Sequence, residues 1–175
     1  MNECIMPGGI NIRPMCEQDL PQVLEIDQLS FSMPWPEHSY RYELFENKTS
    51  LCYVAEQIFP GSHRVIGMAV VWLVEDEAHI ATIAVHPDFR GQGIGKCLMA
   101  EVLRCSVQRG ARLATLEVRA GNVVAQRMYR IFGLEVVSSR PRYYHDNQED
   151  ALIMTVSNLD KRYLQWLDNQ FVTPD

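Results

Sequence analysis

Three glycines at alternate positions, Gly91, Gly93 and Gly95, stand between an apolar run at 83–85 and a helical pattern that begins at Ile94. The run is typical of a buried strand, and the pattern has apolar residues four apart. A strand that enters a glycine-rich turn at a helix N-terminus exposes unpaired backbone N–H groups and the positive end of the helix dipole. Glycines lack the side chains that would keep a phosphate away. The stretch is a candidate site for a pyrophosphate-bearing cofactor. A purely structural glycine turn could have the same sequence.

Two common phosphate loops do not fit the spacing. A Walker A loop would need a glycine where Arg90 stands and a hydroxyl residue where Cys97 stands. The dinucleotide fingerprint needs G-x-G-x-x-G, whereas the glycines here run G-x-G-x-G. No acidic residue follows at a strand end about twenty residues on to take a ribose. The letters R-G-x-G-x-G after V-x-P instead resemble the acetyl-CoA loop of the GNAT N-acetyltransferase superfamily.

Further segments occur in one order and make the resemblance more specific: Phe31-Ser32-x-Pro34-Trp35-x-Glu37, Leu116-Glu117-Val118-Arg119-Ala120-x-Asn122, Tyr129-x-x-Phe132-Gly133, Arg142-Tyr143-Tyr144 and Glu149-Asp150-Ala151-x-Ile153-Met154. Together they resemble the ribosomal-protein-alanine N-acetyltransferases of the RimI type, over about residues 12–157. Members of that family acetylate the N-terminal amine of a protein. The resemblance implies the GNAT fold, an α/β fold with a mixed sheet flanked by helices.

The resemblance also implies roles for individual residues. Glu117 matches the family's general base and Tyr129 its general acid, with no covalent acyl-enzyme. Such groups suit the chemistry, because an N-terminal amine is partly protonated at neutral pH and must lose a proton before it attacks a thioester. The backbone N–H of Val85 is expected to meet the oxyanion that forms on attack.

Acetyl-CoA is the implied cofactor, with the strand edge at 83–85 pairing with its pantetheine arm. The implied binding residues are Ile83, Ala84, Val85, Gly91, Gln92, Gly93, Ile94, Gly95, Lys96 and Asn122. The loops 31–37 and 143–147 would form the acceptor groove, with Trp35, Tyr143 and Tyr144 as substrate-binding residues. The letters His145-Asp146-Asn147 depart from the family's proline-containing loop, so the acceptor's own sequence is not implied.

The candidates also have structural explanations that the sequence leaves open. Glu117 can be a solvent-facing charge paired with Arg119, and Tyr129 can be a core residue on an apolar helix face. Asn122 can serve as a helix N-cap, a role compatible with cofactor contact. Trp35 can simply cover the core.

The remaining polar candidates are weaker. Lys96 can bind phosphate by charge, or through its amide alone with the side chain in water. The five histidines have neither metal-ligand spacing nor an accompanying acid–histidine cluster, so no metal is assigned. A cysteine nucleophile is not expected, because no partner base stands beside Cys97 or Cys105.

The elements that must position these residues follow the order β-α-α-β-β-β-α-β-α-β-β, which indicates a mixed sheet covered by helices. After a loose terminus at 1–9, strands are expected over 10–13, 51–56, 64–74, 78–85, 112–119, 135–138 and 151–156. The first helix begins after an Asp19 cap and includes Phe31 on its apolar face; others cover 37–47, 93–109 and 122–133. Tyr143 and Tyr144 fall in a polar loop. One GNAT domain is expected at 10–157, followed by a C-terminal extension at 158–175 with helical spacing.

Composition sets the outer bounds. A chain of 175 residues with 47% hydrophobic and 22% charged residues is typical of one soluble globular domain. A net charge of −6 argues against a nucleic-acid surface and permits a basic protein partner. Five cysteines without a C-x-x-C pair indicate reduced thiols. With neither a signal peptide nor a membrane-length apolar run, we expect a cytoplasmic protein that has no membrane partner.

The sequence therefore predicts an enzyme that moves acetyl from acetyl-CoA to a protein N-terminal amine, with alanine of a ribosomal protein as the expected acceptor. The same fold can instead serve a lysine side chain or a small-molecule amine. A non-catalytic acyl-CoA-binding module is a third hypothesis, which the presence of both Glu117 and Tyr129 disfavours.

Overall fold

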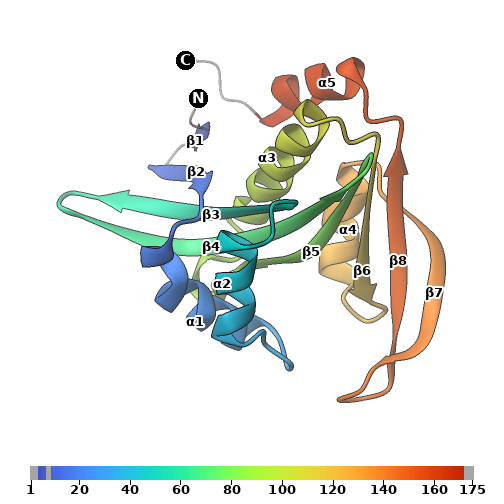
Figure 1. The fold of residues 1–175 in the computed structure, drawn as a ribbon, viewed down its shortest axis with the longest axis horizontal. Coiled ribbons are helices and arrows are strands. Elements are labelled where there is room, and N and C mark those ends of the chain that lie inside the picture. Colours follow the sequence, from blue (N-terminus) through green and yellow to red (C-terminus); the bar gives the residue numbers. More distant parts are fainter. Residues whose placement is uncertain (1–3, 7–8, 172–175) are drawn as a thin grey trace.

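One mixed sheet of eight strands runs through the molecule, in the order β1-β2-β3-β4-β5-β6-β8-β7 (Figure 1). The structure is a computed structural model that describes residues 4–6 and 9–171. Its strands are β1 (Cys4–Met6), β2 (Ile10–Pro14), β3 (Ser50–Phe59), β4 (Ser62–Val74), β5 (Glu77–Val85), β6 (Leu113–Arg119), β7 (Glu135–Tyr144) and β8 (Glu149–Ser157). Its helices are α1 (Leu20–Ser30), α2 (Glu37–Phe45), α3 (Ile94–Gln108), α4 (Val123–Ile131) and α5 (Lys161–Phe171), with 3-10 turns at Glu17–Asp19 and Pro87–Phe89. The predicted mixed sheet with flanking helices is confirmed.

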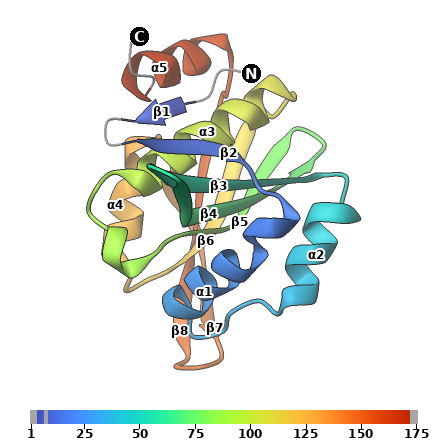
Figure 2. The ribbon, with the colours of Figure 1, turned by 90° about the vertical axis from the view of Figure 1, so that its left-hand side faces the viewer.

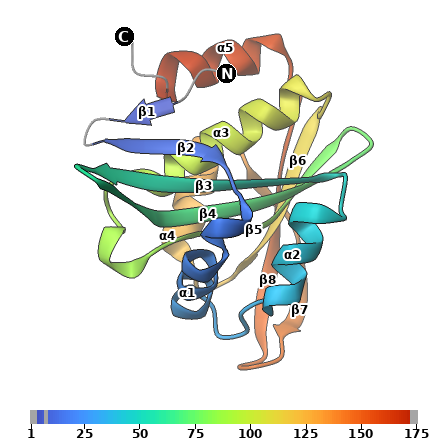
Figure 3. The same cartoon turned by 60° about the vertical axis from the view of Figure 1, so that its left-hand side comes forward.

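Helices cover both faces of the sheet (Figures 2 and 3). Helices α1 and α2 pack on one face of β3, β4 and β5, over a core that includes Val23, Ile26 and Tyr40. Helix α3 packs on the opposite face, where α4 and α5 complete a second and larger core. Because β4 lies between the two cores, its residues from Val65 to Val71 are all buried, which explains their apolar run.

The strands β5 and β6 diverge, and this divergence positions the site. They run parallel and pair over three residues only, from Glu77↔Leu113 to His79↔Thr115. Beyond that point β5 remains paired with β4, and β6 with β8. We call the facing unpaired edges, 80–85 of β5 and 116–119 of β6, the β5/β6 split. Figure 1 shows the two strands meeting at one end and spreading apart toward α4. Unpaired strand edges offer backbone N–H and C=O groups to an extended ligand.

The C-terminal helix α5 packs on α3 (Figure 1). Leu167 is fully buried, and the Tyr163 hydroxyl donates to the backbone oxygen of Phe132 at 2.8 Å. The helix therefore docks on the body of the chain, a point that helical spacing alone leaves open. None of the helices in the described part of the chain has the length and apolar character needed to span a membrane.

The first helix begins where expected, but two details of the prediction are wrong. Asp19 precedes α1, yet its carboxylate makes no cap; it accepts hydrogen bonds from Arg13 Nη1 at 2.7 Å and from the Cys16 N–H at 2.8 Å instead. An arginine within reach satisfies the carboxylate better than a helix amide does. Phe31 does not share the apolar face of the helix, because the chain leaves α1 at this residue in an extended conformation and the ring is exposed.

Two other predictions about strands also change. Cys4–Met6 forms a short strand paired with β2, where a loose terminus was expected; residues 1–3 and 7–8 lie outside the described part. The hairpin of β7 and β8 is longer than its apolar pattern, so Tyr143 and Tyr144 belong to β7 and not to a loop. A register shift between Arg140 and Tyr144 interrupts the alternation on which the strand prediction depends.

Candidate active site

The glycine loop forms a cradle of free amides at the start of α3. Gly91 and Gly93 have φ angles of +79° and +84°, values that other residues adopt only with strain. None of the five N–H groups from Gly91 to Gly95 donates to another described residue. The Lys96 N–H does donate, to the Gly93 oxygen at 3.0 Å, so Lys96 has its exposed ammonium rather than its amide for a phosphate. The cradle fits the predicted pyrophosphate.

The end of β5 directs backbone groups into the β5/β6 split. The His86 N–H donates to the Ile66 oxygen of β4 at 2.9 Å, so the preceding Val85 points its own N–H and C=O away from β4. The Val85 oxygen accepts from Arg90 Nε at 3.0 Å, and Arg90 Nη2 also donates to Ser30 Oγ at 3.0 Å. Arg90 thus ties the loop to β5 and α1. The Val85 N–H has no hydrogen-bond partner within residues 4–6 and 9–171, and it faces the side where the oxyanion is predicted.

Helix α4 approaches the loop closely. A Cβ on Gly95 would lie 3.2 Å from Met128 Sδ and 3.6 Å from Val85 Cγ2, so the start of α3 packs closely between α4 and β5. Asn122 caps α4 through its side chain, which accepts from the Ala125 N–H at 3.1 Å. The structural explanation of Asn122 is therefore confirmed, and its cofactor contact stays a prediction.

Glu117 lies on β6 at the split, on the face covered by α1 and α2. Its Oε2 is 3.2 Å from His79 Nε2 and its Oε1 is 3.2 Å from Arg140 Nη1, with 18% of the side chain exposed. The alternative in which Glu117 pairs with Arg119 is not what the structure shows, because the partners of Glu117 are His79 and Arg140. The pair with His79 was not anticipated from the sequence. The sequence alone conceals it, because the register that brings β5 beside β6 depends on the tertiary fold.

A stack of rings connects Trp35 to this pair. The His79 ring lies 5.4 Å from the Trp72 ring at 12°, and Trp72 lies 6.2 Å from Trp35 at 14°. The backbone N–H of Trp35 donates to Asp27 Oδ2 at 2.6 Å, and burial raises the pKa of Asp27. Trp35 therefore covers the core, as one of its two readings has it, and its role as a substrate-binding residue stays a prediction.

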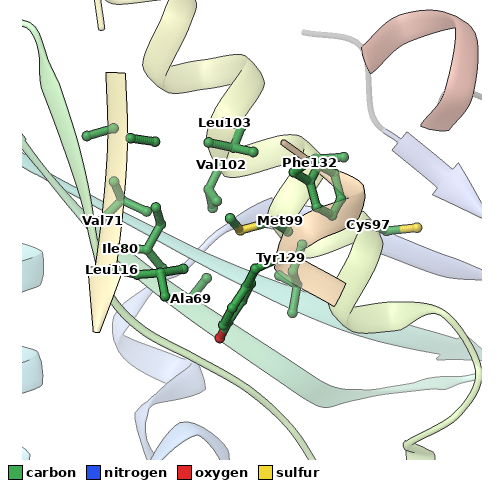
Figure 4. Close-up of a cluster of buried hydrophobic side chains, with 14 of the residues drawn as sticks. Ala69, Val71, Ile80, Cys97, Met99, Val102, Leu103, Leu116, Tyr129 and Phe132 are labelled. Carbon is green, nitrogen blue, oxygen red and sulfur yellow. The ribbon is translucent and has the colours of Figure 1, made fainter. Parts of the chain in front are cut away.

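Tyr129 comes to the split from the opposite face. Its ring packs in the larger core beside Met99 and Leu116, and Figure 4 shows the hydroxyl at the edge of that cluster, pointing away from the other labelled side chains. The hydroxyl has no hydrogen-bond partner among the described residues. Burial, with a smaller contribution from Tyr144, raises the pKa of Tyr129, so the phenol keeps its proton. A neutral, unpartnered hydroxyl is available as a proton donor.

Tyr143 and Tyr144 lie next to each other at the end of β7. Their rings lie 5.3 Å apart, edge to face. The Arg119 guanidinium stacks 3.8 Å from the Tyr144 ring centre, and the Arg140 guanidinium lies 5.4 Å from that of Tyr143. Arginine stacking on an aromatic face is attractive and fixes the ring plane. The structure thus links Glu117 to Trp35 through the ring stack and to Tyr143 through Arg140, and Tyr144 packs against Tyr143.

The surroundings of Glu117 include residues that were assigned no role from the sequence: His79, Trp72 and Arg140. The signal that pointed toward them was weak. His79 and Glu117 are polar residues within apolar strands, and only their shared face makes this meaningful. Among the described residues, no group of three or more His, Cys, Asp or Glu side chains could hold a metal ion.

Comparison with known proteins gives a family for this arrangement. The Acetyltransferase (GNAT) family matches residues 20–134. A Bacillus subtilis protein, provisionally described as a ribosomal protein bS18-alanine N-acetyltransferase, is 38% identical over 83% of this chain and 94% of its own length. The Escherichia coli ribosomal protein bS18-alanine N-acetyltransferase is 32% identical over 79% of this chain and 90% of its own.

Solved structures agree. The crystal structure of the E. coli ribosomal-protein-S18-alanine N-acetyltransferase has a TM-score of 0.75 at 30% identity, covering 85% of this chain and 94% of that one. The structure of Ard1 from Thermoplasma volcanium has a TM-score of 0.76 at 25% identity, covering 87% and 99%. The fold, the free-amide cradle and these relatives agree, and the chain belongs to the GNAT acetyltransferase family as an acetyl-CoA-dependent N-acetyltransferase.

Proposed function

We propose that this enzyme acetylates the N-terminal α-amine of a protein, that of an alanine at the start of a ribosomal protein. The observation that carries the proposal is the placement of Glu117 and the Tyr129 hydroxyl on opposite faces of the β5/β6 split. One face supplies a proton acceptor and the other a proton donor, as amine attack on a thioester requires. The named acceptor rests on the relatives, whose own substrate is the alanine of ribosomal protein bS18.

The steps follow from the proposed roles. The cradle at Gly91–Gly95 and the Lys96 ammonium would hold the pyrophosphate, and the edge at 83–85 would pair with the pantetheine arm. Acetyl-CoA supplies the acetyl group. Glu117 takes the proton from the acceptor amine as the new N–C bond forms, and the Val85 N–H stabilises the developing oxyanion. Tyr129 gives its proton to the departing thiolate.

The proposed function also has consequences for the domain boundaries and the cellular location of the enzyme. Residues 10–157 form the catalytic domain, with 158–175 as a C-terminal extension whose helix α5 docks on α3. Action on a ribosomal protein places the enzyme in the cytoplasm.

The test is CoA release by the purified protein on matched peptides. One set has free N-terminal alanine, serine or methionine; a second has the same peptides N-blocked; a third is N-blocked with an internal lysine. Turnover on free α-amines alone, highest with alanine and with label on the α-nitrogen by mass spectrometry, is the expected result. Turnover on the lysine set would show that the enzyme acetylates lysine side chains. Acetyl-CoA binding without turnover on any of these peptides would argue against a protein acceptor.

A further inference from the structure

We propose that His79 is a positioning residue for Glu117 and sets the pH below which the reaction fails, an inference that rests on Glu117 being the base. His79 is the last residue of β5 that pairs with β6, so it lies where the β5/β6 split opens. Its Nε2 is 3.2 Å from Glu117 Oε2, within ion-pair distance of the carboxylate. Their side chains are only 26% and 18% exposed, so water competes weakly for this contact.

The imidazole is itself held in place. Trp72 stacks on the ring at 5.4 Å, and the Trp72 Nε1–H donates to Glu43 Oε2 at 3.0 Å. Glu43 is buried and also accepts from Asn47 Nδ2 at 2.8 Å. An indole fixed at its nitrogen fixes the plane of the ring stacked on it. The plane of the imidazole then determines where Nε2 points.

Fixing one carboxylate oxygen has a direct chemical consequence. A carboxylate accepts a proton efficiently only when the accepting oxygen faces the donor, and a free side chain samples many rotamers. An imidazole held by its stack on Trp72 and lying 3.2 Å from Oε2 restricts the rotamers of the carboxylate. Oε1 then remains on the side of Arg140, whose side chain is 52% exposed.

Protonation of His79 changes this balance. An imidazole ordinarily titrates near pH 6.5. The charged groups that face the pair are Arg140 from β7 on Glu117 and Glu43 from α2 behind Trp72, while the Tyr144 phenol lies near Glu117. An imidazolium would give Glu117 a second cationic neighbour beside Arg140, which favours the ionised carboxylate and weakens it as a base. Activity should therefore fall as the pH drops into the range in which an imidazole takes up a proton.

Two substitutions separate these effects. His79→Gln keeps an N–H at a similar reach but cannot titrate, whereas His79→Leu removes the donor. His63→Gln, on an exposed turn-side residue of β4, is the matched control. The measurement is kcat and both KM values from about pH 5.5 to 9, which spans the ordinary histidine pKa. Folding of each variant is checked by thermal unfolding.

His79→Leu should lower kcat about 10- to 100-fold at pH 8 with the KM for acetyl-CoA unchanged, since a misdirected base slows chemistry without weakening cofactor binding. His79→Gln should keep kcat within about threefold at pH 8 and extend activity to lower pH. A wild-type pH profile in His79→Gln, or full activity in folded His79→Leu, would overturn the inference. If His79→Leu does not fold, the profile of His79→Gln decides.

Failure of the underlying base assignment would look different. A wild-type kcat in Glu117→Gln would show that Glu117 is not the base. If Glu117→Gln is inactive but the His79 variants behave as wild type, Glu117 remains the base and only the role proposed for His79 is wrong.

Discussion

Arg119 and Asp146 form an ion pair, Nη2 to Oδ2 at 2.9 Å, that joins β6 to the tip of the β7–β8 hairpin. Ser32, between α1 and α2, donates to the same carboxylate at 2.5 Å and accepts from Arg119 at 3.0 Å. The two segments predicted to form the acceptor groove are thus linked across it. The hydrogen bonds from Ser32 and Arg119 keep the pKa of Asp146 below its usual value. The carboxylate therefore stays ionised through the neutral range, and the link weakens only as the pH falls through that lowered pKa.

Removal of this link should weaken acceptor binding. In Asp146→Ala the two segments must be ordered by the peptide itself, at a cost of about 1 kcal/mol for each side chain immobilised. The KM for the peptide should rise about five- to tenfold, with kcat and the KM for acetyl-CoA nearly unchanged. Asp76→Ala, in the exposed β4–β5 turn, is the control. Equal peptide KM values in the two variants would argue against a role for the link.

Loss of the proposed base should slow chemistry alone. Glu117→Gln keeps the size of the side chain but cannot accept a proton, so kcat should fall about 10²- to 10⁴-fold. Acetyl-CoA affinity, measured by calorimetry, should stay within about twofold because the cradle lies on a different element. Glu135→Gln, an exposed change on β7, should leave both quantities unchanged. Weak acetyl-CoA binding in Glu117→Gln would count against its assignment as base.

The proposed acid can be separated from its packing role. Tyr129→Phe keeps the buried ring and removes a hydroxyl without a described partner, so the free energy of unfolding should change by less than about 1 kcal/mol. Its kcat should fall by about 10² or more. Tyr163→Phe is the converse control, because it loses the 2.8 Å hydrogen bond to Phe132 and should cost about 1 kcal/mol with kcat unchanged. A fully active Tyr129→Phe would leave Tyr129 a core residue only.

The glycine cradle has a matched pair of test positions. Gly91 and Gly61 have φ angles of +79° and +80°, and a Cβ at either would meet nothing within 4 Å. Each change to alanine should therefore cost a similar backbone strain, about 1–2 kcal/mol. Only Gly91→Ala should also raise the KM for acetyl-CoA, by about tenfold, since its Cβ adds bulk beside the free amides. Equal KM values in the two variants would place the cofactor elsewhere.

Much of the fold was predictable because its signals are local. The glycine loop, the Asn122 cap and the alternation of β6 each lie within a few residues, and the structure has them where the sequence indicates. The predictions were wrong where a residue distant in the sequence determined the local contacts or the extent of a strand. Asp19 turned to Arg13 rather than to its own helix, and Tyr143 and Tyr144 extended a strand because β8 pairs alongside.

The sequence by itself determined the family and the identity of the cofactor, since contiguous motifs carry both. Tertiary structure decided which groups surround Glu117. His79, Arg140 and Glu117 come from β5, β7 and β6, and no pattern within one strand fixes the register between them. The same holds for Ser32, Arg119 and Asp146, which lie far apart along the chain and meet at one carboxylate. Side-chain contacts across a sheet depend on how the strands twist and pair, and that is settled only when both cores are packed.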